Sequence, residues 1–270
     1  MGIETIKRRR SVRTFDGSVV PRETLDLITK FMQAVDNPFG VPVHFALLDA
    51  DADRLSSPVV VGAKTYIAAK VERQERAEEA FGYSFEKVIL YVTSLGLGSV
   101  WLAATLDRRA FETAMDLKPG EIMPAASPLG YAADKMSLRE KAMRRGMRSD
   151  DRAPFDELFF VGDFGHPLSS EDAGAWRVPL EMVRVAPSAT NRQPWRVVVQ
   201  NDAVHFYECK ARGYEKSSTG DIQKVDLGIA ACHFETALEE VGVKGGFIQA
   251  DPRIAAPDNC GYVFSYTRKD

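Results

Sequence analysis

The chain repeats one order of glycines, prolines and apolar segments in its two halves. Four pairs of identical residues recur at two nearly equal separations. The pairs are Gly82 and Gly228, Gly96 and Gly242 at 146 positions (228 minus 82), and Ala34 and Ala186, Pro42 and Pro194 at 152 positions (194 minus 42). Two constant separations of this kind predict two copies of one folding unit, so the fold has to be built from two similar halves.

Each half contains a long segment that is apolar on nearly every face. The first is YSFEKVILYVTSLGLGS, residues 83–99, and the second lies within DIQKVDLGIAACHFETALEEVGVKGGFI, residues 221–248. Both have helical spacing and both reach a glycine, which is typical of a helix end. A helix that is apolar all round belongs in a core or an interface. We therefore expect the two helices to pack on each other, which makes the single chain an internal dimer.

The first half alternates between helix and strand patterns before its apolar helix. Residues 21–35 follow a proline and have apolar side chains at helical spacing, which predicts an amphipathic helix. Residues 41–50 and 57–69 are rich in β-branched and aromatic side chains, which predicts strands. The charged run KVERQERAEEA, residues 70–80, is predicted to be a helix.

The second half shows the same alternation. A helix is expected in the later part of residues 169–185, and residues 196–210 are predicted to form a hairpin that turns at Asn201-Asp202. The whole pattern predicts an α+β sandwich of two tandem half-units, residues 1–160 and 161–270, packed as an internal pseudo-dimer.

Composition excludes several classes of protein. The 35 Lys and Arg residues against 38 Asp and Glu give a net charge of -3, which argues against a dedicated nucleic-acid binder or a polybasic membrane anchor. The three cysteines, Cys209, Cys232 and Cys260, form no C-x-x-C motif and are expected to be reduced core thiols. The sequence shows neither a signal peptide nor an apolar run that could span a bilayer, so the cytoplasm is the expected location.

A basic cluster near the N-terminus, RRRSVRTF, places four arginines and a serine within six positions, from Arg8 to Arg13. Guanidinium groups with a hydroxyl between them suit a phosphate monoester, because each can offer two parallel charge-assisted hydrogen bonds. A solvated basic run is the alternative. The segment TFDGSVVP ties the cluster directly to the first predicted helix, which favours a binding role.

A second polar motif, PSATNRQPW, runs from Pro187 to Trp195. Ser188, Asn191 and Gln193 supply hydrogen-bonding groups on a turn, and Trp195 begins the strand that would hold the turn rigid. A plain loop between helix and strand is the alternative. The density of polar groups beside an anchored aromatic side chain favours a ligand.

The stretch SLGLGSVWLAATL is predicted to be a glycine helix end followed by a strand, with backbone amides near residues 101–104 available to a ligand. The four histidines show no metal-ligand spacing and are expected to have structural or surface roles. No nucleophile elbow, HExxH motif or carboxylate pair occurs in the sequence. Phosphate-binding groups without an evident acid, base, nucleophile or metal site point to chemistry carried by an organic cofactor.

Five stretches of the sequence together resemble one known family: RRSVRTF, APSATNRQPW, GLGSVWL, ASPLGYA and RAPFDELF. They resemble the FMN-dependent nitroreductases, in which two identical subunits share flavin sites across a dimer interface. Here the Arg-Ser motif occurs only in the first half and the Asn-x-Gln-Pro-Trp motif only in the second. DNPFGVPVHF is the first half's faded counterpart of the latter. The chain thus resembles a single-chain, tandem branch of this family.

The resemblance implies one composite FMN site between the halves. The arginines and serine of the first half would hold the FMN phosphate, and a later arginine would close over it. The turn in the second half would reach the flavin, and residues 101–104 would lie beside its N5 edge, where Ala103-Ala104 replaces a Glu-Gly pair of some members. The implied residues are Arg9, Arg10, Ser11, Arg13, Trp101, Leu102, Ala103, Arg152, Pro187, Ser188, Asn191 and Gln193.

The resemblance also implies a reaction. NADH or NADPH would reduce FMN, and a nitroaromatic, a quinone or a similar small electron-poor acceptor would then take the place of the nicotinamide, in ping-pong order. Neither nucleic acid nor membrane is expected as a partner, and the internally paired helices predict a monomer.

Three alternatives stay open. The first is a flavin-binding protein without turnover, for storage, sensing or delivery. The second is chemistry on the flavin itself or on a specialised, for example halogenated, substrate. The third is a purely structural role for both motifs, in which the basic run is simply solvated.

Overall fold

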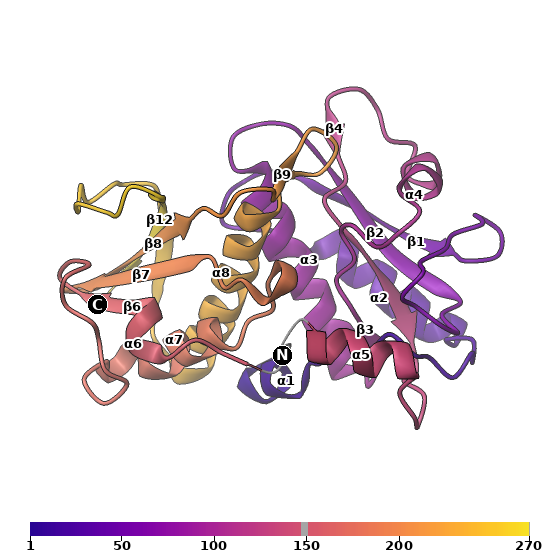
Figure 1. Ribbon diagram of the computed structural model, residues 1–270, viewed down its shortest axis with the longest axis horizontal. Coiled ribbons are helices and arrows are strands. Elements are labelled where there is room, and N and C mark those ends of the chain that lie inside the picture. Colours follow the sequence, from indigo (N-terminus) through magenta and orange to yellow (C-terminus); the bar gives the residue numbers. More distant parts are fainter. Residues whose placement is uncertain (147–150, 270) are drawn as a thin grey trace.

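The computed structural model describes residues 1–146 and 151–269, which form two lobes joined along a pair of central helices (Figure 1). Each lobe contains a five-stranded sheet. The first sheet has the order β1-β2-β5-β3, with β4 also paired to β2, and its strands are β1 (Val43–Asp49), β2 (Thr65–Glu72), β3 (Gly98–Ser99), β4 (Glu121–Ile122) and β5 (Ala126–Gly130). Neighbouring strands of this sheet are antiparallel.

The second sheet has the order β11-β12-β8-β7-β6 and is antiparallel except for the parallel pair β6 and β7. Its strands are β6 (Phe159–Val161), β7 (Trp195–Gln200), β8 (Ala203–Cys209), β11 (Gly245–Ile248) and β12 (Cys260–Arg268). A separate two-stranded pair, β9 (Glu215–Lys216) with β10 (Gly220–Asp221), lies between β8 and the following helix. The predicted half boundary at residue 160 falls within β6 and stays a prediction.

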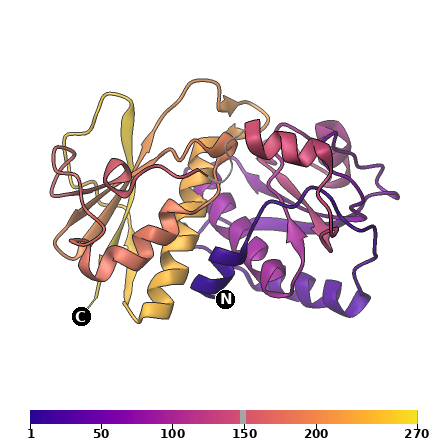
Figure 2. The same cartoon turned by 60° about the horizontal axis from the view of Figure 1, so that its bottom comes forward.

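Two long helices, α3 (Ala77–Ser94) and α8 (Ile222–Val241), lie side by side between the sheets in both views (Figures 1 and 2). A methyl group on Gly82 would lie 2.0 Å from the carbonyl oxygen of Val225, and one on Gly228 would lie 2.0 Å from that of Glu79. Because a side chain at either point would strike the opposite backbone, glycine alone permits this close crossing. The equivalent glycines of the repeat thus meet across the junction, as the internal-dimer prediction requires.

The ends of these two helices are equivalent as well. Gly96, two residues beyond α3, has φ +81°, and Gly242, directly after α8, has φ +75°. Both values lie in the left-handed region that glycine adopts readily at a helix end. One continuous apolar core draws its buried side chains from both halves. The α+β fold of two tandem half-units packed as a pseudo-dimer is therefore confirmed.

The remaining helices cover the outer faces of the sheets or connect the halves. They are α1 (Ile3–Arg8), α2 (Arg22–Ala34), α4 (Arg108–Ala114), α5 (Leu138–Gly146), α6 (Phe155–Leu158) and α7 (Arg177–Arg184), with short 3-10 turns at Gly174–Trp176 and Ala189–Asn191. Helix α1 packs against both central helices. Its Ile3 backbone N–H donates to Glu240 of α8 at 2.6 Å, so the N-terminus is fastened to the second half. Across the described residues, no helix has the length and apolarity needed to cross a membrane.

Several local predictions are confirmed: α2, β1, the β7–β8 hairpin with its turn at Asn201-Asp202, and the ends of the central helices. The helix predicted over residues 70–80 is wrong for residues 70–76 and confirmed only for residues 77–80. Strand β2 continues to Glu72, and α3 begins only at Ala77, after Arg76 in the left-handed region with φ +66°. The reason is tertiary, because Val71 pairs with Val43 on one side and Ile122 on the other and is completely buried.

The strand predicted over residues 57–69 begins later, at Thr65. The cysteine prediction also needs correction. Cys209 and Cys260 form a disulfide, and Cys232 is the buried free thiol. Cys209 lies directly opposite Cys260 in the register of β8 and β12. Their 51-residue separation follows no motif, so only the sheet register reveals the pair.

Candidate functional site

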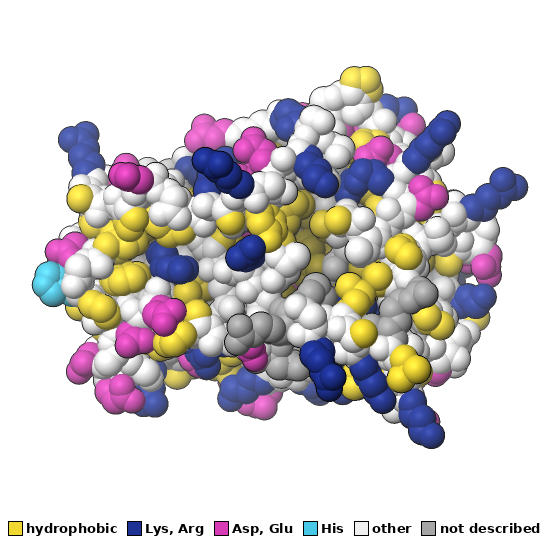
Figure 3. Space-filling model, in the orientation of Figure 1, with side chains coloured by type: hydrophobic (Ala, Val, Ile, Leu, Met, Phe, Trp, Pro, Cys, Tyr) yellow, Lys and Arg dark blue, Asp and Glu magenta, His cyan; other side chains and the backbone are white. Residues whose placement is uncertain are grey.

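A cavity of about 780 Å³ lies between the two halves. Its walls come from the N-terminal segment, the residues after β3, the turn before β7, the loop after β8 and the first turns of α8. In Figure 3 this face of the molecule is hollowed near its centre, where apolar side chains are exposed and Lys and Arg side chains stand around them. The cavity thus combines an apolar interior with a basic border.

One end of the cavity is formed by the basic motif. Ser11 bridges to Ser99 of β3, and the Val12 N–H donates to the Ser99 carbonyl at 2.8 Å, which fixes the motif to the first sheet. Arg13 is buried, with 5% of its surface exposed. Among the described residues, nothing accepts hydrogen bonds from the Nε and Nη1 groups of Arg13 or from the Nε of Arg9. Buried guanidinium donors without acceptors are costly, so this end of the cavity is suited to an anion.

Burial lowers the pKa of both arginines. For Arg9 the carboxylate of Glu86, 3.7 Å from its Nε, partly offsets that effect, and nearby Arg144 of α5 adds to it. For Arg13 the same opposing contributions come from Glu140 and Arg144. Because arginine stays charged in proteins, the result is a set of poorly solvated cations rather than neutral side chains.

The turn from Pro187 to Trp195 forms the facing wall. Three of its non-glycine residues, Thr190, Asn191 and Gln193, lie in the left-handed region with φ between +48° and +57°. Such backbone is costly and persists only where surrounding contacts hold it. Ser188 Oγ accepts from the Gln193 N–H at 2.8 Å, and Trp195 is completely buried at the start of β7. The turn is therefore held in a strained shape by its own side chains and by its anchor.

Contacts from outside the turn complete its support. Arg152 donates to Asn191 Oδ1 at 3.2 Å and to the Val185 carbonyl at 3.2 Å. The carboxylate of Asp226 on α8 accepts from the Ala189 N–H at 3.0 and 3.1 Å. Burial raises the pKa of Asp226 well above its usual value; the hydrogen bond from Ala189 opposes this effect, and the charges of Asp221 and Glu208 add to it. Asp226 thus orders the turn through the contacts of its carboxyl group with one backbone N–H.

The wall on the first-half side rests on a buried polar network. Trp101 donates its indole N–H to Glu86 Oε2 at 2.7 Å, and His233 of α8 lies 2.9 Å from Glu86 Oε1. The other ring nitrogen of His233 lies 3.0 Å from the Met182 carbonyl, which can only accept, so that nitrogen carries a proton. Glu86 therefore joins Trp101, Arg9 and the second half at the base of the cavity.

The chain is similar to proteins of known family and known structure. A family model described as "Putative TM nitroreductase" matches residues 2–238. The chain belongs to this nitroreductase family. A Thermotoga maritima nitroreductase-family protein of known crystal structure is 21% identical, with a TM-score of 0.64, and the match covers 99% of this chain and 94% of that one. At this identity the likeness concerns the fold.

A Bacteroides fragilis nitroreductase whose crystal structure contains bound FMN is 23% identical, with a TM-score of 0.41, covering 50% of this chain and 90% of that one. An iodotyrosine deiodinase with bound FMN and 3-iodo-L-tyrosine is 18% identical, with a TM-score of 0.42, covering 51% of this chain and 92% of that one. Among curated proteins, none matches the chain.

Most of the residues that the resemblance pointed to line this nitroreductase cavity. They are Arg9, Ser11, Arg13, Trp101, Ala103, Arg152, Pro187, Ser188 and Asn191. Arg10 is exposed outside it, because the chain alternates direction between Arg9 and Ser11. Leu102 packs into a separate apolar cluster beneath the first sheet. Gln193 is buried and accepts from the Ala153 N–H at 3.0 Å, so it supports the turn rather than facing the cavity.

Sequence reasoning missed several residues of this site. Asp226, Arg212, Tyr214 and Lys216 line the cavity, and so does Met143 of α5. Burial alone would raise the pKa of Tyr214, but its hydrogen bonds with Thr190 and Arg192 outweigh that effect and lower it. Three of these residues lie in the stretch CKARGYEKSSTGDIQ, residues 209–223, and nothing in its spacing indicates which side chains turn inward. Within the described ranges, no cluster of His, Cys, Asp and Glu could hold a metal ion.

Proposed function

We propose that this nitroreductase-family chain is an FMN-dependent NAD(P)H oxidoreductase with one composite FMN site. Its acceptor would be a small electron-poor molecule such as a nitroaromatic compound or a quinone. The chain would act as a monomer, since its central helices already pack on each other within one molecule. It would act in the cytoplasm.

The observation that carries this proposal is the set of buried donors at the basic end of the cavity. Arg13 and Arg9 present guanidinium N–H groups that no described residue accepts from. A phosphate monoester dianion satisfies such donors with short, charge-assisted hydrogen bonds. The phosphate of FMN fits this donor set, and the apolar interior beside it suits a flat aromatic ring.

The chain's own residues divide the work of holding the cofactor. Arg9, Ser11 and Arg13 would bind the phosphate from the first half. Asn191, oriented by Arg152, would approach from the second half together with the backbone of Pro187 and Ser188. The segment from Trp101 to Ala104 would lie along the ring, steadied by the bond from Trp101 to Glu86.

FMN, when bound, supplies hydride transfer between a reduced nicotinamide and an acceptor, which is chemistry the protein's side chains do not provide. The chain would orient both substrates in turn over the same apolar wall and would place positive charge near the cofactor. Water at the open mouth of the cavity would supply the proton that the acceptor needs.

A visible spectrum of the purified protein, with the molar ratio of FMN to chain, tests the proposal. NADH and NADPH are then added separately without oxygen. About one FMN per chain that bleaches promptly with either nucleotide is the expected result. Bound FMN that resists both nucleotides would favour a carrier without turnover, and failure to bind added FMN would refute the proposed site.

A further inference from the structure

The loop between β8 and α8 closes the composite cavity at the end away from the basic motif. This loop, residues 210–221, carries the short strands β9 and β10. In Figure 1, β9 lies at the top of the boundary between the halves, whereas β3 and α5, which flank the basic motif, lie below. Substrates that approach a bound cofactor from this side would meet the loop first.

The loop is a built part of the site rather than a loose connection. Arg73, at the end of β2, donates to the Ser217 carbonyl, so the first half holds the tip of a second-half loop. The Tyr214 hydroxyl lies 2.6 Å from Thr190 Oγ1 and accepts from Arg192 Nε at 3.1 Å. These contacts tie the loop to the strained turn on one side and to the first sheet on the other.

Two cations of this loop, Arg212 and Lys216, line the cavity with no partner for their charge. Neither side chain has a hydrogen bond or an ion pair within residues 1–146 and 151–269. Their neighbour Lys210 behaves differently, because its ammonium group lies 3.0 Å from Asp221 and is neutralised. Within this loop, the two cations without an acidic partner are therefore the two that line the cavity.

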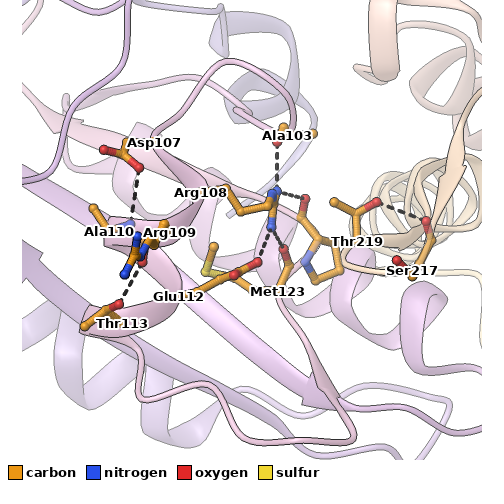
Figure 4. Close-up of polar contacts among 12 residues, drawn as sticks. Ala103, Asp107, Arg108, Arg109, Ala110, Glu112, Thr113, Met123, Ser217 and Thr219 are labelled. Carbon is orange, nitrogen blue, oxygen red and sulfur yellow. Dashed lines mark hydrogen bonds and ion pairs between the residues drawn. The ribbon is translucent and has the colours of Figure 1, made fainter.

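The other charged groups of the cavity do not cancel this charge. Arg108 is a further cation, and its guanidinium group donates to the carbonyl groups of Ala103 and Met123, each at 2.8 Å, as Figure 4 shows. Asp226 is the only acidic residue among the described residues that line the cavity. Its carboxyl group is held by the Ala189 N–H in the turn before β7. The substrate end therefore stays positive in a chain whose net charge is -3.

We propose that Arg212 and Lys216 form an anion-recognition pair, which selects substrates carrying a carboxylate or phosphate group away from the reacting atoms. The inference rests on the proposed function, since it describes the other end of the same cavity. Such a group has two possible sources in a ping-pong reaction. It is either a substituent on the acceptor or the 2′-phosphate that distinguishes NADPH from NADH.

Isothermal titration of the oxidised, FMN-loaded protein separates these sources without any turnover. The first pair of probes is 4-nitrobenzoate and the neutral 4-nitrobenzamide, and the second pair is NADP⁺ and NAD⁺. We expect the anionic probe of at least one pair to bind about tenfold more tightly, which is the scale of two exposed charge pairs. That preference should shrink at high salt.

The decisive variant is the double substitution Arg212→Ala with Lys216→Ala. It should remove the preference for the anionic probe and leave binding of the neutral probe within about twofold. Lys30→Ala is the matched control, because Lys30 is an exposed cation on α2 outside the cavity. Loss of preference within the nitrobenzoate pair identifies the acceptor as the source of the anion, and loss within the nucleotide pair identifies the nicotinamide donor.

Two results would overturn the proposed anion-recognition pair, and one would overturn the proposed function on which it rests. Equal binding of charged and neutral probes by the original protein rejects it, and so does a preference that survives in the double variant. FMN content is measured in the same samples. Failure to load FMN would instead refute the proposed function, and the inference would fall with it.

Discussion

Asn191 and Phe39 occupy equivalent positions of the two halves, 152 residues apart (191 minus 39). Asn191 lines the composite cavity and accepts a hydrogen bond from Arg152. Phe39 packs its ring between others, with centroids 5.5 Å from Phe264 and 6.4 Å from Tyr83. One position of the repeat thus presents a polar group to a cavity in one half and fills space in the other.

The related pocket around Phe39 is accordingly small, about 270 Å³ against about 780 Å³ for the composite cavity. Phe247, which stands 146 residues after Trp101 (247 minus 101), lines this pocket with Phe39 and Phe264. Backbone contacts at Gly82 and Gly228 leave no room for a side chain, so the helix crossing constrains both halves equally. Side chains in the second pocket have no such constraint, and the rings of Phe39, Phe247 and Phe264 line it.

A substitution at the crossing of α3 and α8, which both halves share, should have the largest effect on stability. Gly228→Ala puts a methyl group 2.0 Å from a backbone carbonyl of α3, and we expect it to lower the free energy of unfolding by about 3 kcal/mol. Urea unfolding followed by circular dichroism measures it. Gly246→Ala is the control, because its added methyl group meets nothing within 4 Å. Equal stability of the two variants would show that the helices do not cross this closely.

Arg13→Ala changes the composite cavity and leaves the second pocket as it is. Removing charge-assisted hydrogen bonds to the FMN phosphate should cost about 2 kcal/mol of binding free energy, or about thirtyfold in the dissociation constant. Quenching of flavin fluorescence on titration provides the measurement. Arg10→Ala removes the same charge three positions earlier, outside the cavity, and should change affinity by less than about twofold. A similar loss of FMN affinity in both variants would show that the motif acts only as a general basic patch.

Phe39→Ala and Asn191→Ala test the two equivalent positions against each other. We expect Phe39→Ala to lower the free energy of unfolding by about 2 kcal/mol, since a partly buried ring is lost, and to leave the FMN ratio near one per chain. Asn191→Ala should weaken FMN binding instead. Denaturant melts and FMN titration of both variants supply the comparison, and a second FMN bound by Phe39→Ala would mean that packing alone closes that pocket.

Glu208→Gln, a substitution in β8, should give the smallest effect. Glu208 lies opposite Trp195 of β7. Burial, together with the nearby charge of Asp221, raises the pKa of Glu208 to about 7. A carboxyl whose pKa is raised on folding stabilises the folded state most at low pH and loses that contribution as pH rises through about 7. The original protein should therefore lose about 1 kcal/mol more stability than Glu208→Gln between about pH 5 and about pH 8. Parallel pH curves would contradict the assignment.

Much of the fold could be predicted because its signals are local. The apolar faces of α3 and α8, the glycines at their ends and the turn at Asn201-Asp202 follow from periodicity and backbone freedom. Residues 70–76 could not be predicted in the same way. Their charge suggested a helix, but pairing of Val71 with two neighbouring strands extends β2 instead.

The candidate site divides along a similar line. Its motifs are contiguous stretches, so Arg9, Ser11, Arg13 and the turn at Asn191 stand out in the sequence. Arg212, Lys216 and Asp226 lack such a motif and join the cavity only because the loop after β8 and the first turns of α8 fold over it. Arg10 and Gln193 belong to the motifs, yet the backbone turns one outward and buries the other.

By itself, the sequence determined that the chain is a repeated unit with two central helices and one intact pair of basic and turn motifs. Those features depend on spacing and on steric limits at single residues, which a linear string records. Only the tertiary structure decided that Cys209 meets Cys260, that three aromatic rings line the second pocket and that cations without an acidic partner line the first. Each of these depends on the register of strands and the crossing of helices, which bring together residues that no local pattern connects.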